Sequence, residues 1–169
     1  PLSHGLFWLP YLMGERTPHL DPIARGGWIG LTAKHGRAEM IRAIVEGVSY
    51  SLKDCLGVIE HMGVDIQSVR ASGGGARSPF WRQMLADIFH RGVSTLENTE
   101  GSAYGAALLA VAGTGQYASV EELCGVAIRE TECLIPNVHE SAAYERGYEV
   151  FSILYPTLKP VYSLIQQMA

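Results

Sequence analysis

The chain has 169 residues, of which 47% are hydrophobic and 18% charged, so it can build a folded core and is not a disordered chain. Its 13 basic and 17 acidic residues give a net charge of -4, which makes nucleic acid an unfavourable partner. No apolar run reaches the length of a membrane-spanning helix, about 18 residues, so we expect no membrane segment. The 3 cysteines include no C-x-x-C pair, and we therefore expect a reduced, cytoplasmic protein without a disulfide framework.

Residues 1–35 are predicted to form an irregular loop, because glycine and proline recur throughout the second half of this segment. Residues 36–169 are predicted to form an α/β core with C-terminal helices, and the whole chain 1–169 is interpreted as a single partial domain. The strongest periodic signal predicts a long helix over residues 36–62, ended by Gly63. Its apolar stripe consists of Ile41, Ile44, Val45, Val48, Leu52, Cys55, Leu56, Ile59 and Met62.

Beyond residue 62, helix and strand patterns alternate, which is typical of an α/β arrangement with parallel strands. The expected strands cover residues 66–72, 93–96 and 132–136, and the expected helices cover 78–90, 100–114, a short segment from 119 and 141–155. Ser78-Pro79 and Ser119 have the sequence of helix N-caps. Pro156 and Pro160 predict a kink or a break before a last turn that ends near Met168.

The run Gly73-Gly74-Gly75-Ala76 between a strand and a helix is the sharpest local motif. Residues without a Cβ atom let a ligand lie against the backbone, and the following helix offers free N–H groups to phosphate or ribose. The run is neither a P-loop nor the G-x-G-x-x-G dinucleotide fingerprint. Taken alone, the run is a weak signal and is more often a plain tight turn.

Other catalytic signatures are absent from the sequence. The 6 histidines are scattered without metal-ligand spacing, so we expect no metal site built by this chain. There is no G-x-S-x-G nucleophile motif, and the carboxylates do not form an evident acid/base pair. Pattern alone therefore offers a nucleotide-binding segment without a catalytic base.

Three blocks of sequence resemble the C-terminal part of the FGGY carbohydrate kinases, most closely the xylulokinase branch. The blocks are FWLPYLMGERTPHLDP at residues 7–22, GGWIGL at 26–31 continued by EMIRAIVE at 39–46, and GGGARSPFWRQ at 73–83. The second block is long and gapped and is met at each fixed position, so chance explains it poorly. The Gly-Glu-Arg-Thr-Pro run favours xylulokinases over the glycerol kinase branch.

The resemblance implies a ribonuclease H-like, actin-like ATPase fold: a truncated C-terminal domain, rich in helices, with a short parallel sheet. It implies transfer of the γ-phosphoryl group of ATP to a sugar hydroxyl with Mg²⁺, D-xylulose being the expected acceptor and D-xylulose 5-phosphate the product. The nucleotide-binding residues that it implies are Gly73, Gly74, Gly75, Ala76 and Ser78, the last near the adenine. It also places Glu15, Arg16 and Asp21 toward the cleft between the two kinase domains, although a role in folding their loop is an equal alternative.

By the same resemblance, the N-terminal domain of these kinases is missing, with most of the sugar site and the catalytic aspartate. No catalytic residue is therefore assigned here, and we expect the chain alone to be inactive. The strand at residues 66–72 would lack one neighbour, so we expect self-association. Two alternatives stay open: another acceptor such as ribulose, gluconate or glycerol, and a non-catalytic, kinase-like interaction module.

Overall fold

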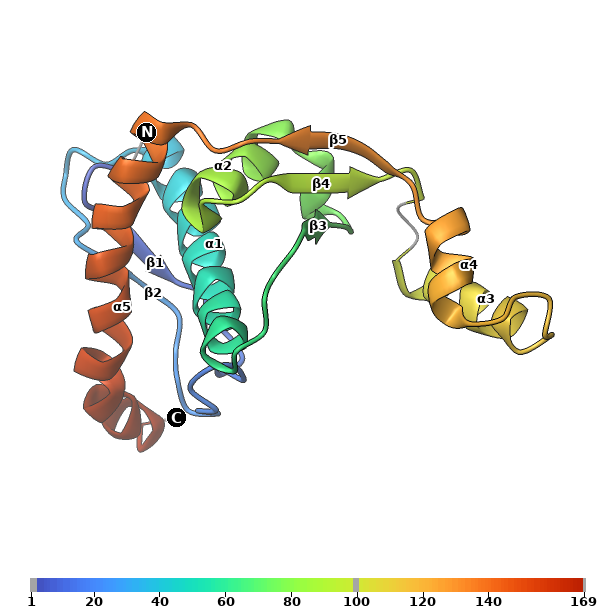
Figure 1. Ribbon diagram of the computed structural model, residues 1–169. Helices are drawn as coiled ribbons and strands as arrows, with labels where there is room; N and C mark the ends of the chain where they lie inside the picture. The colour runs from blue at the N-terminus through green and yellow to red at the C-terminus, as the bar shows by residue number, and fades with distance from the viewer. Residues whose placement is uncertain (1–2, 99–100, 169) are drawn as a thin grey trace. The chain divides into compact units, whose positions relative to one another are not determined.

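The computed structural model describes residues 3–98 and 101–168, which form two compact units (Figure 1). The first unit holds the described residues up to Ile66, together with Asp87–His90 and the segment that begins at Asn137. The second unit holds Gln67–Ala86 and Arg91–Pro136. Each unit is considered by itself below.

The first unit begins with two short antiparallel strands, β1 (Phe7–Leu9) and β2 (Gly27–Ile29). Trp8 pairs with Trp28 in the register of these strands, and the two ring centroids lie 4.4 Å apart. The segment predicted to be irregular therefore contains regular structure at both ends of its central loop. Strands of three residues are too short to show the alternation of apolar and polar positions by which strands are recognised in a sequence.

Helix α1 (Arg37–His61) confirms the long helix predicted from the apolar stripe. At its start, Glu39 Oε2 accepts a hydrogen bond of 2.8 Å from the backbone N–H of Gly36. Just beyond its end, Gly63 has φ +80°, a backbone conformation that glycine adopts without strain.

Helix α1 packs directly on strand β1, with Leu6, Trp8 and Ala43 at the centre of the contact. Gly47 lies where the two backbones meet, because a Cβ atom at this position would stand 2.0 Å from the carbonyl oxygen of Trp8. Close approach of helix and strand thus depends on the absence of a side chain at Gly47.

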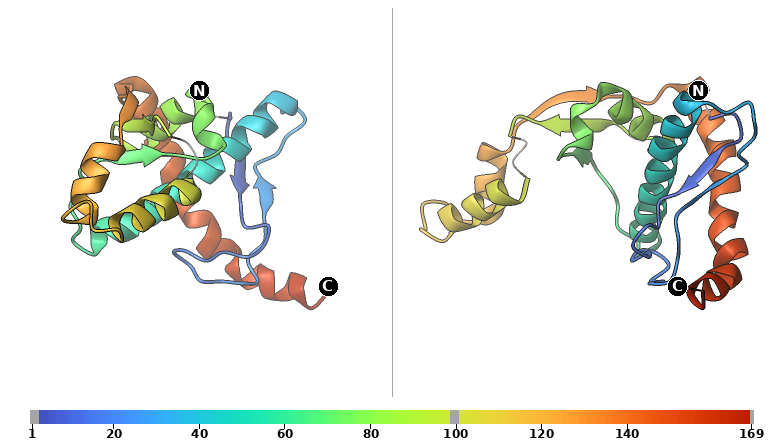
Figure 2. Two further views of the ribbon diagram at one scale, coloured as in Figure 1. Left: turned by 90° about the vertical axis from the view of Figure 1, so that its right-hand side faces the viewer. Right: turned by 180° about the vertical axis from the view of Figure 1, so that it is seen from behind.

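Helix α5 (Val138–Gln166) runs beside α1 in the first unit (Figure 2). Asn137 caps it by accepting hydrogen bonds from the N–H groups of His139 and Glu140, as N-cap residues do. The two helices meet through buried aromatic rings, since the ring centroids of Tyr50 and Phe151 are 5.3 Å apart.

Of the kink or break predicted at Pro156 and Pro160, the break does not occur, because α5 continues through both prolines. A proline inside a helix costs about 3 kcal/mol. Side chains on both sides hold the helix in place: Tyr155 and Tyr162 are 5% and 4% exposed. Burial of two such rings offsets a cost of that size.

The second unit is built on a three-stranded sheet in the order β3 (Val69–Ala71), β4 (Val93–Leu96) and β5 (Glu130–Leu134). Strands β3 and β4 are parallel, as predicted, whereas β5 runs antiparallel to β4 and makes the sheet mixed. Within the described residues, β3 has a neighbour on its β4 side only.

Three helices accompany this sheet: α2 (Pro79–Phe89), α3 (Gly101–Ala112) and α4 (Val120–Ala127). The predicted N-cap at Ser119 is confirmed, since its side chain accepts a hydrogen bond from the N–H of Glu122. The first residue of the helix predicted over 100–114 lies outside the described residues. Among the helices that the structure describes, none combines the length and the apolar composition needed to cross a bilayer.

Candidate functional site

The glycine run forms an exposed turn directly after strand β3. Gly73 has φ +82°, which favours glycine over any other residue. Both Gly73 and Gly74 are exposed, and a Cβ atom added to either would meet nothing within 4 Å. This part of the turn is therefore bare backbone that a ligand can approach.

The third glycine has a different role. A Cβ atom at Gly75 would stand 2.6 Å from the ring of Trp81, so Gly75 lets this indole pack on the turn. The next residue, Ala76, is half-buried in the short 3₁₀ turn Gly75–Arg77. The sequence alone does not distinguish the roles of these glycines, because the fold decides which residues each glycine contacts in space.

Ser78 connects the turn to helix α2. Its Oγ accepts a hydrogen bond of 3.3 Å from the N–H of Trp81, and Pro79 is the first residue of the helix, which confirms the predicted N-cap. The five residues predicted to bind nucleotide thus form one continuous stretch that ends at the N-terminus of α2, where N–H groups and the helix dipole favour an anion.

The same edge of the sheet carries a second group of residues. Because β3 and β4 are parallel, the glycine turn and the Glu97-Asn98 pair both follow the carboxyl ends of neighbouring strands. Ligands of open α/β sheets bind at such edges. A cavity of about 370 Å³ opens here, lined by Glu97, Asn98, Tyr104 and Ala127. Sequence reasoning did not assign these residues, although the position of Glu97 and Asn98 just after a predicted strand was a usable signal.

Arg82 is engaged inside the second unit and is not free to bind phosphate. Its side chain is 11% exposed, and its Nη2 lies 2.7 Å from Glu132 Oε2. Its Nη1 donates a hydrogen bond of 3.2 Å to Thr95 Oγ1. Arg82 therefore ties α2 to strands β4 and β5.

The described residues contain no group of three or more histidine, cysteine or acidic side chains placed to hold a metal ion. Mg²⁺ in kinases is held by one or two carboxylates together with the phosphates of the substrate. The described part of the chain therefore forms no closed metal cage from its own side chains.

In the first unit, Glu15 and Asp21 close the predicted cleft loop. Their backbones exchange two hydrogen bonds of 2.8 Å, and Glu15 Oε2 accepts a further bond of 2.7 Å from the N–H of His19. Gly14 allows this closure, because a Cβ atom there would stand 2.8 Å from the backbone of Pro22.

Asp21 is buried and connects the loop to helix α5. Its Oδ2 accepts a hydrogen bond of 2.8 Å from the hydroxyl of Tyr155, and its Oδ1 accepts one of 3.0 Å from the N–H of Ile23. The bond from Tyr155 lowers the pKa of Asp21 below its ordinary value, and the bond from Ile23 acts in the same direction. Arg16 differs from both acids: it is exposed, and no interaction with another described residue engages its guanidinium.

Glu15 and Asp21 thus make the hydrogen bonds that the loop-folding alternative requires, and the cleft role of the three predicted residues stays a prediction. Glu46 on α1 is another buried acid with a structural role. Its Oε2 accepts hydrogen bonds from the backbone N–H and the Oγ of Ser3, and its Oε1 pairs with Arg42 at 2.7 Å. Burial nevertheless raises the pKa of Glu46 above its ordinary value.

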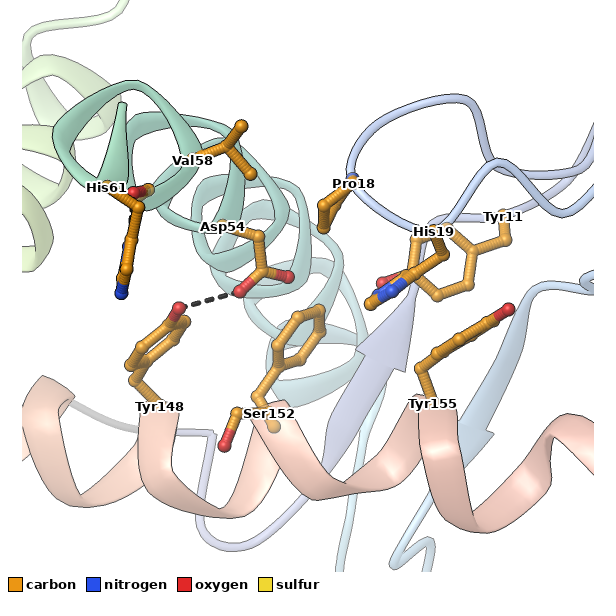
Figure 3. Close-up of a pocket in the computed structure, with 11 residues that line it drawn as sticks. Tyr11, Pro18, His19, Asp54, Val58, His61, Tyr148, Ser152 and Tyr155 are labelled. Carbon is orange, nitrogen blue, oxygen red and sulfur yellow. Dashed lines mark hydrogen bonds between the residues drawn. The ribbon is translucent and has the colours of Figure 1, made fainter. Parts of the chain in front are cut away.

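A pocket of about 200 Å³ lies between the loop, α1 and α5 of the first unit (Figure 3). Its wall includes Asp54, whose carboxylate faces the hydroxyl of Tyr148 in the close-up view. The Tyr148 hydroxyl donates a hydrogen bond of 2.6 Å to Asp54 Oδ1. No feature of the sequence pointed to this pocket, since its two polar residues are 94 positions apart.

Comparison with known proteins identifies the family. Residues 1–114 match the family described as the FGGY family of carbohydrate kinases, C-terminal domain. The chain belongs to the FGGY family of carbohydrate kinases. Relatives in this family include the xylulose kinase of Escherichia coli, which is 42% identical over 161 residues, covering 94% of this chain and 33% of that protein. The gluconokinase of Bacillus subtilis is 42% identical over 135 residues, covering 78% of this chain and 26% of that protein.

Solved structures of FGGY kinases agree with this result. The structure of ligand-bound xylulose kinase from Lactobacillus acidophilus superposes with a TM-score of 0.88 at 30% identity, over 96% of this chain and 33% of that one. The predicted fold class, the C-terminal domain of an actin-like ATPase, is thereby confirmed. The chain spans about one third of the length of the FGGY relatives that it matches.

Proposed function

We propose that the second unit binds the ATP of a carbohydrate kinase at the exposed glycine turn. The observation that carries the proposal is the bare backbone at Gly73 and Gly74, which lies at the carboxyl edge of a parallel strand pair and leads into the N-terminus of α2. Phosphate groups can approach such a turn without a steric cost, and the helix dipole favours their charge. Ala76 and Ser78 continue the same surface, and Gly75 maintains it by accommodating Trp81.

The reaction we propose is transfer of the γ-phosphoryl group of ATP to a sugar hydroxyl, with D-xylulose as the acceptor and D-xylulose 5-phosphate as the product. Support comes from the xylulose kinases among the relatives of the chain. Gluconate is the second candidate acceptor, because a gluconokinase reaches the same 42% identity, although over fewer residues. Mg²⁺ would neutralise charge on the phosphates during this transfer.

Phosphoryl transfer also needs a base near the attacking hydroxyl. We assign no described residue of this chain to that role. We propose that the base and most of the sugar contacts belong to the part of the kinase that this chain does not cover. The chain alone should then bind nucleotide without phosphorylating a sugar, which a kinase assay with D-xylulose or gluconate, ATP and Mg²⁺ measures directly.

Two further assignments follow from the same proposal. Of the three loop residues predicted for the cleft, we assign only Arg16 to contacts across it, because Glu15 and Asp21 are bound within their own loop. We place the enzyme in the cytoplasm, since all three cysteines are free, as expected in a reducing compartment.

The test is a single substitution in the turn, Gly74→Val. Gly74 has φ -61° and ψ -41°, which valine can adopt, and open space surrounds its missing side chain. The variant should fold normally but place a branched side chain where the nucleotide approaches. We expect millimolar Mg-ATP to raise the melting temperature of the natural chain. We expect the affinity of Gly74→Val for Mg-ATP to be lower by about tenfold or more.

The matched control is Gly125→Val in helix α4, where a side chain also meets nothing within 4 Å and no positive φ is disturbed. This control should bind Mg-ATP as the natural chain does. If Gly74→Val bound Mg-ATP as tightly as the natural chain, the turn would not be part of the nucleotide-binding site. An unshifted melting curve for the natural chain at millimolar Mg-ATP would contradict nucleotide binding by this unit.

A further inference from the structure

The pocket beside Asp54 contains a carboxylate without a cation partner. Asp54 is half-buried, and burial is the main cause that raises its pKa above the ordinary value. Within residues 3–98 and 101–168, its side chain receives one hydrogen bond, from Tyr148, and takes part in no ion pair. A carboxylate in this position is destabilised unless a positive charge approaches it.

Aromatic rings form much of the remaining wall. Tyr148 and Phe151 both come from helix α5 and line the pocket. In the close-up view Tyr148 lies below the carboxylate, and Tyr11 lies farther along the wall (Figure 3). The face of an aromatic ring attracts a cation within about 6 Å of its centroid. The ring of Tyr148 already attracts one cation in this way, since Lys53 Nζ lies 4.4 Å from the centroid of the ring.

Lys53 itself does not fill the pocket. Its Nζ is held 2.6 Å from Glu145 Oε2, which anchors it by an ion pair. The two histidines of the pocket flank the carboxylate, His61 on one side and His19 on the other (Figure 3). His61 Nδ1 is bonded to the carbonyl oxygen of Gly57 at 2.6 Å, and the ring of His19 is stacked on Tyr155 at 3.7 Å. Neighbouring contacts therefore already fix both imidazole rings.

The size and the chemistry of the pocket narrow the class of ligand. A volume of about 200 Å³ corresponds to roughly six or seven water molecules in the liquid. A metal ion would need several hard donors, and no group of three metal-binding side chains exists among the described residues. A carboxylate among aromatic rings matches a primary ammonium group on a short carbon chain.

We propose that the pocket formed by Asp54, Tyr148 and Phe151 is a binding site for a small primary ammonium compound. The ammonium group pairs with the free oxygen of Asp54 and lies against the aromatic faces. Ser152, at the rim, donates its hydroxyl to the carbonyl oxygen of Glu149 and keeps its own oxygen available as an acceptor. A ligand with a hydroxyl next to its ammonium group can use both ends of the pocket.

Ethanolamine, which is protonated at neutral pH, is the probe, and ethylene glycol is its neutral counterpart. Chemical shifts of the Asp54, Gly57 and Tyr148 amides in two-dimensional NMR spectra report binding at constant ionic strength maintained with KCl. We expect saturable shifts with a dissociation constant of roughly 1 mM, which suits a ligand of so few atoms, and none with ethylene glycol. Equal shifts with ethylene glycol would overturn the proposal. So would the absence of shifts with ethanolamine at concentrations up to about 50 mM, roughly 50 times the expected dissociation constant.

Asp54→Asn tests the carboxylate and should weaken ethanolamine binding about tenfold or more, because it removes a charge-assisted bond. The matched control Glu149→Gln removes a carboxylate next to Tyr148 that does not line the pocket, and it should leave the affinity unchanged. Unchanged affinity in a folded Asp54→Asn variant would refute the assignment.

A pH titration of the natural chain keeps the proposal testable even if Asp54→Asn does not fold. The charged groups that act on Asp54 are His19, Glu15 and Lys53, and His61 also lines the pocket. Acidification protonates Asp54, which removes the negative charge that pairs with the ammonium group. Ethanolamine binding should therefore weaken as the pH falls from about 7.5 to about 4.5. An affinity for ethanolamine that stays constant over this pH interval would overturn the proposal.

Discussion

Replacing Gly47 by alanine should separate helix α1 from strand β1. The new Cβ atom would stand 2.0 Å from the carbonyl oxygen of Trp8 and 2.9 Å from its carbonyl carbon. Ordinary contacts of a Cβ atom begin at 3.4 Å, so the two backbones would have to move apart by more than an ångström. Neither backbone can rotate away as a side chain could.

The size of the effect follows from two opposing contributions. Overpacking of a core costs about 1–3 kcal/mol, and a clash between backbones belongs at the upper end of this range. Alanine in place of glycine stabilises the helix by about 1 kcal/mol, because its helix propensity is higher. A net loss of about 2 kcal/mol lowers the melting temperature of a protein of this size by roughly 4–8 °C.

The matched control lies on the same helix. Gly57→Ala adds the same methyl group to α1, where it meets nothing within 4 Å, so only the gain in helix propensity remains. Its melting temperature should rise by about 2–4 °C. Circular dichroism of both variants measures the difference, and the reasoning fails if Gly47→Ala is as stable as Gly57→Ala.

Two further predictions concern the cleft loop and the sheet edge. Tyr155→Phe removes the main cause of the lowered pKa of Asp21, so this pKa should rise in NMR titrations. A lowered pKa stabilises the folded chain above the ordinary value of 3.8 and ceases to do so as the pH falls through the folded pKa. The variant should therefore be less stable than the natural chain at pH 7, with the difference shrinking in acid, and a constant difference would contradict this account. For the sheet, we expect self-association through the open edge of β3, measured as a light-scattering mass that rises with concentration, while a monodisperse monomer would speak against it.

Local signals in the sequence predicted most of the regular structure. The apolar stripe of α1, the N-caps at Ser78 and Ser119 and the parallel pairing of β3 with β4 depend on residues that are near in the chain. The three family blocks predicted the membership in the FGGY kinases in the same way, because their residue types and spacing are written directly in the chain.

Tertiary contacts decided the points at which sequence reasoning failed. The prolines of α5 did not break the helix, because buried rings on both sides hold it against the rest of the first unit. Gly75 has a packing role, whereas Gly73 and Gly74 remain open, since Trp81 reaches only one of the three.

The sequence by itself determined the family, the order of the main helices and strands and the position of the glycine turn. Only the tertiary structure showed that Asp21 is bound by Tyr155, 134 residues away, and that Asp54 meets Tyr148 in a pocket. The physical reason is that capping, helix periodicity and glycine turns are properties of neighbouring residues. Burial, hydrogen-bond partners and pKa shifts arise only when distant parts of the chain come together.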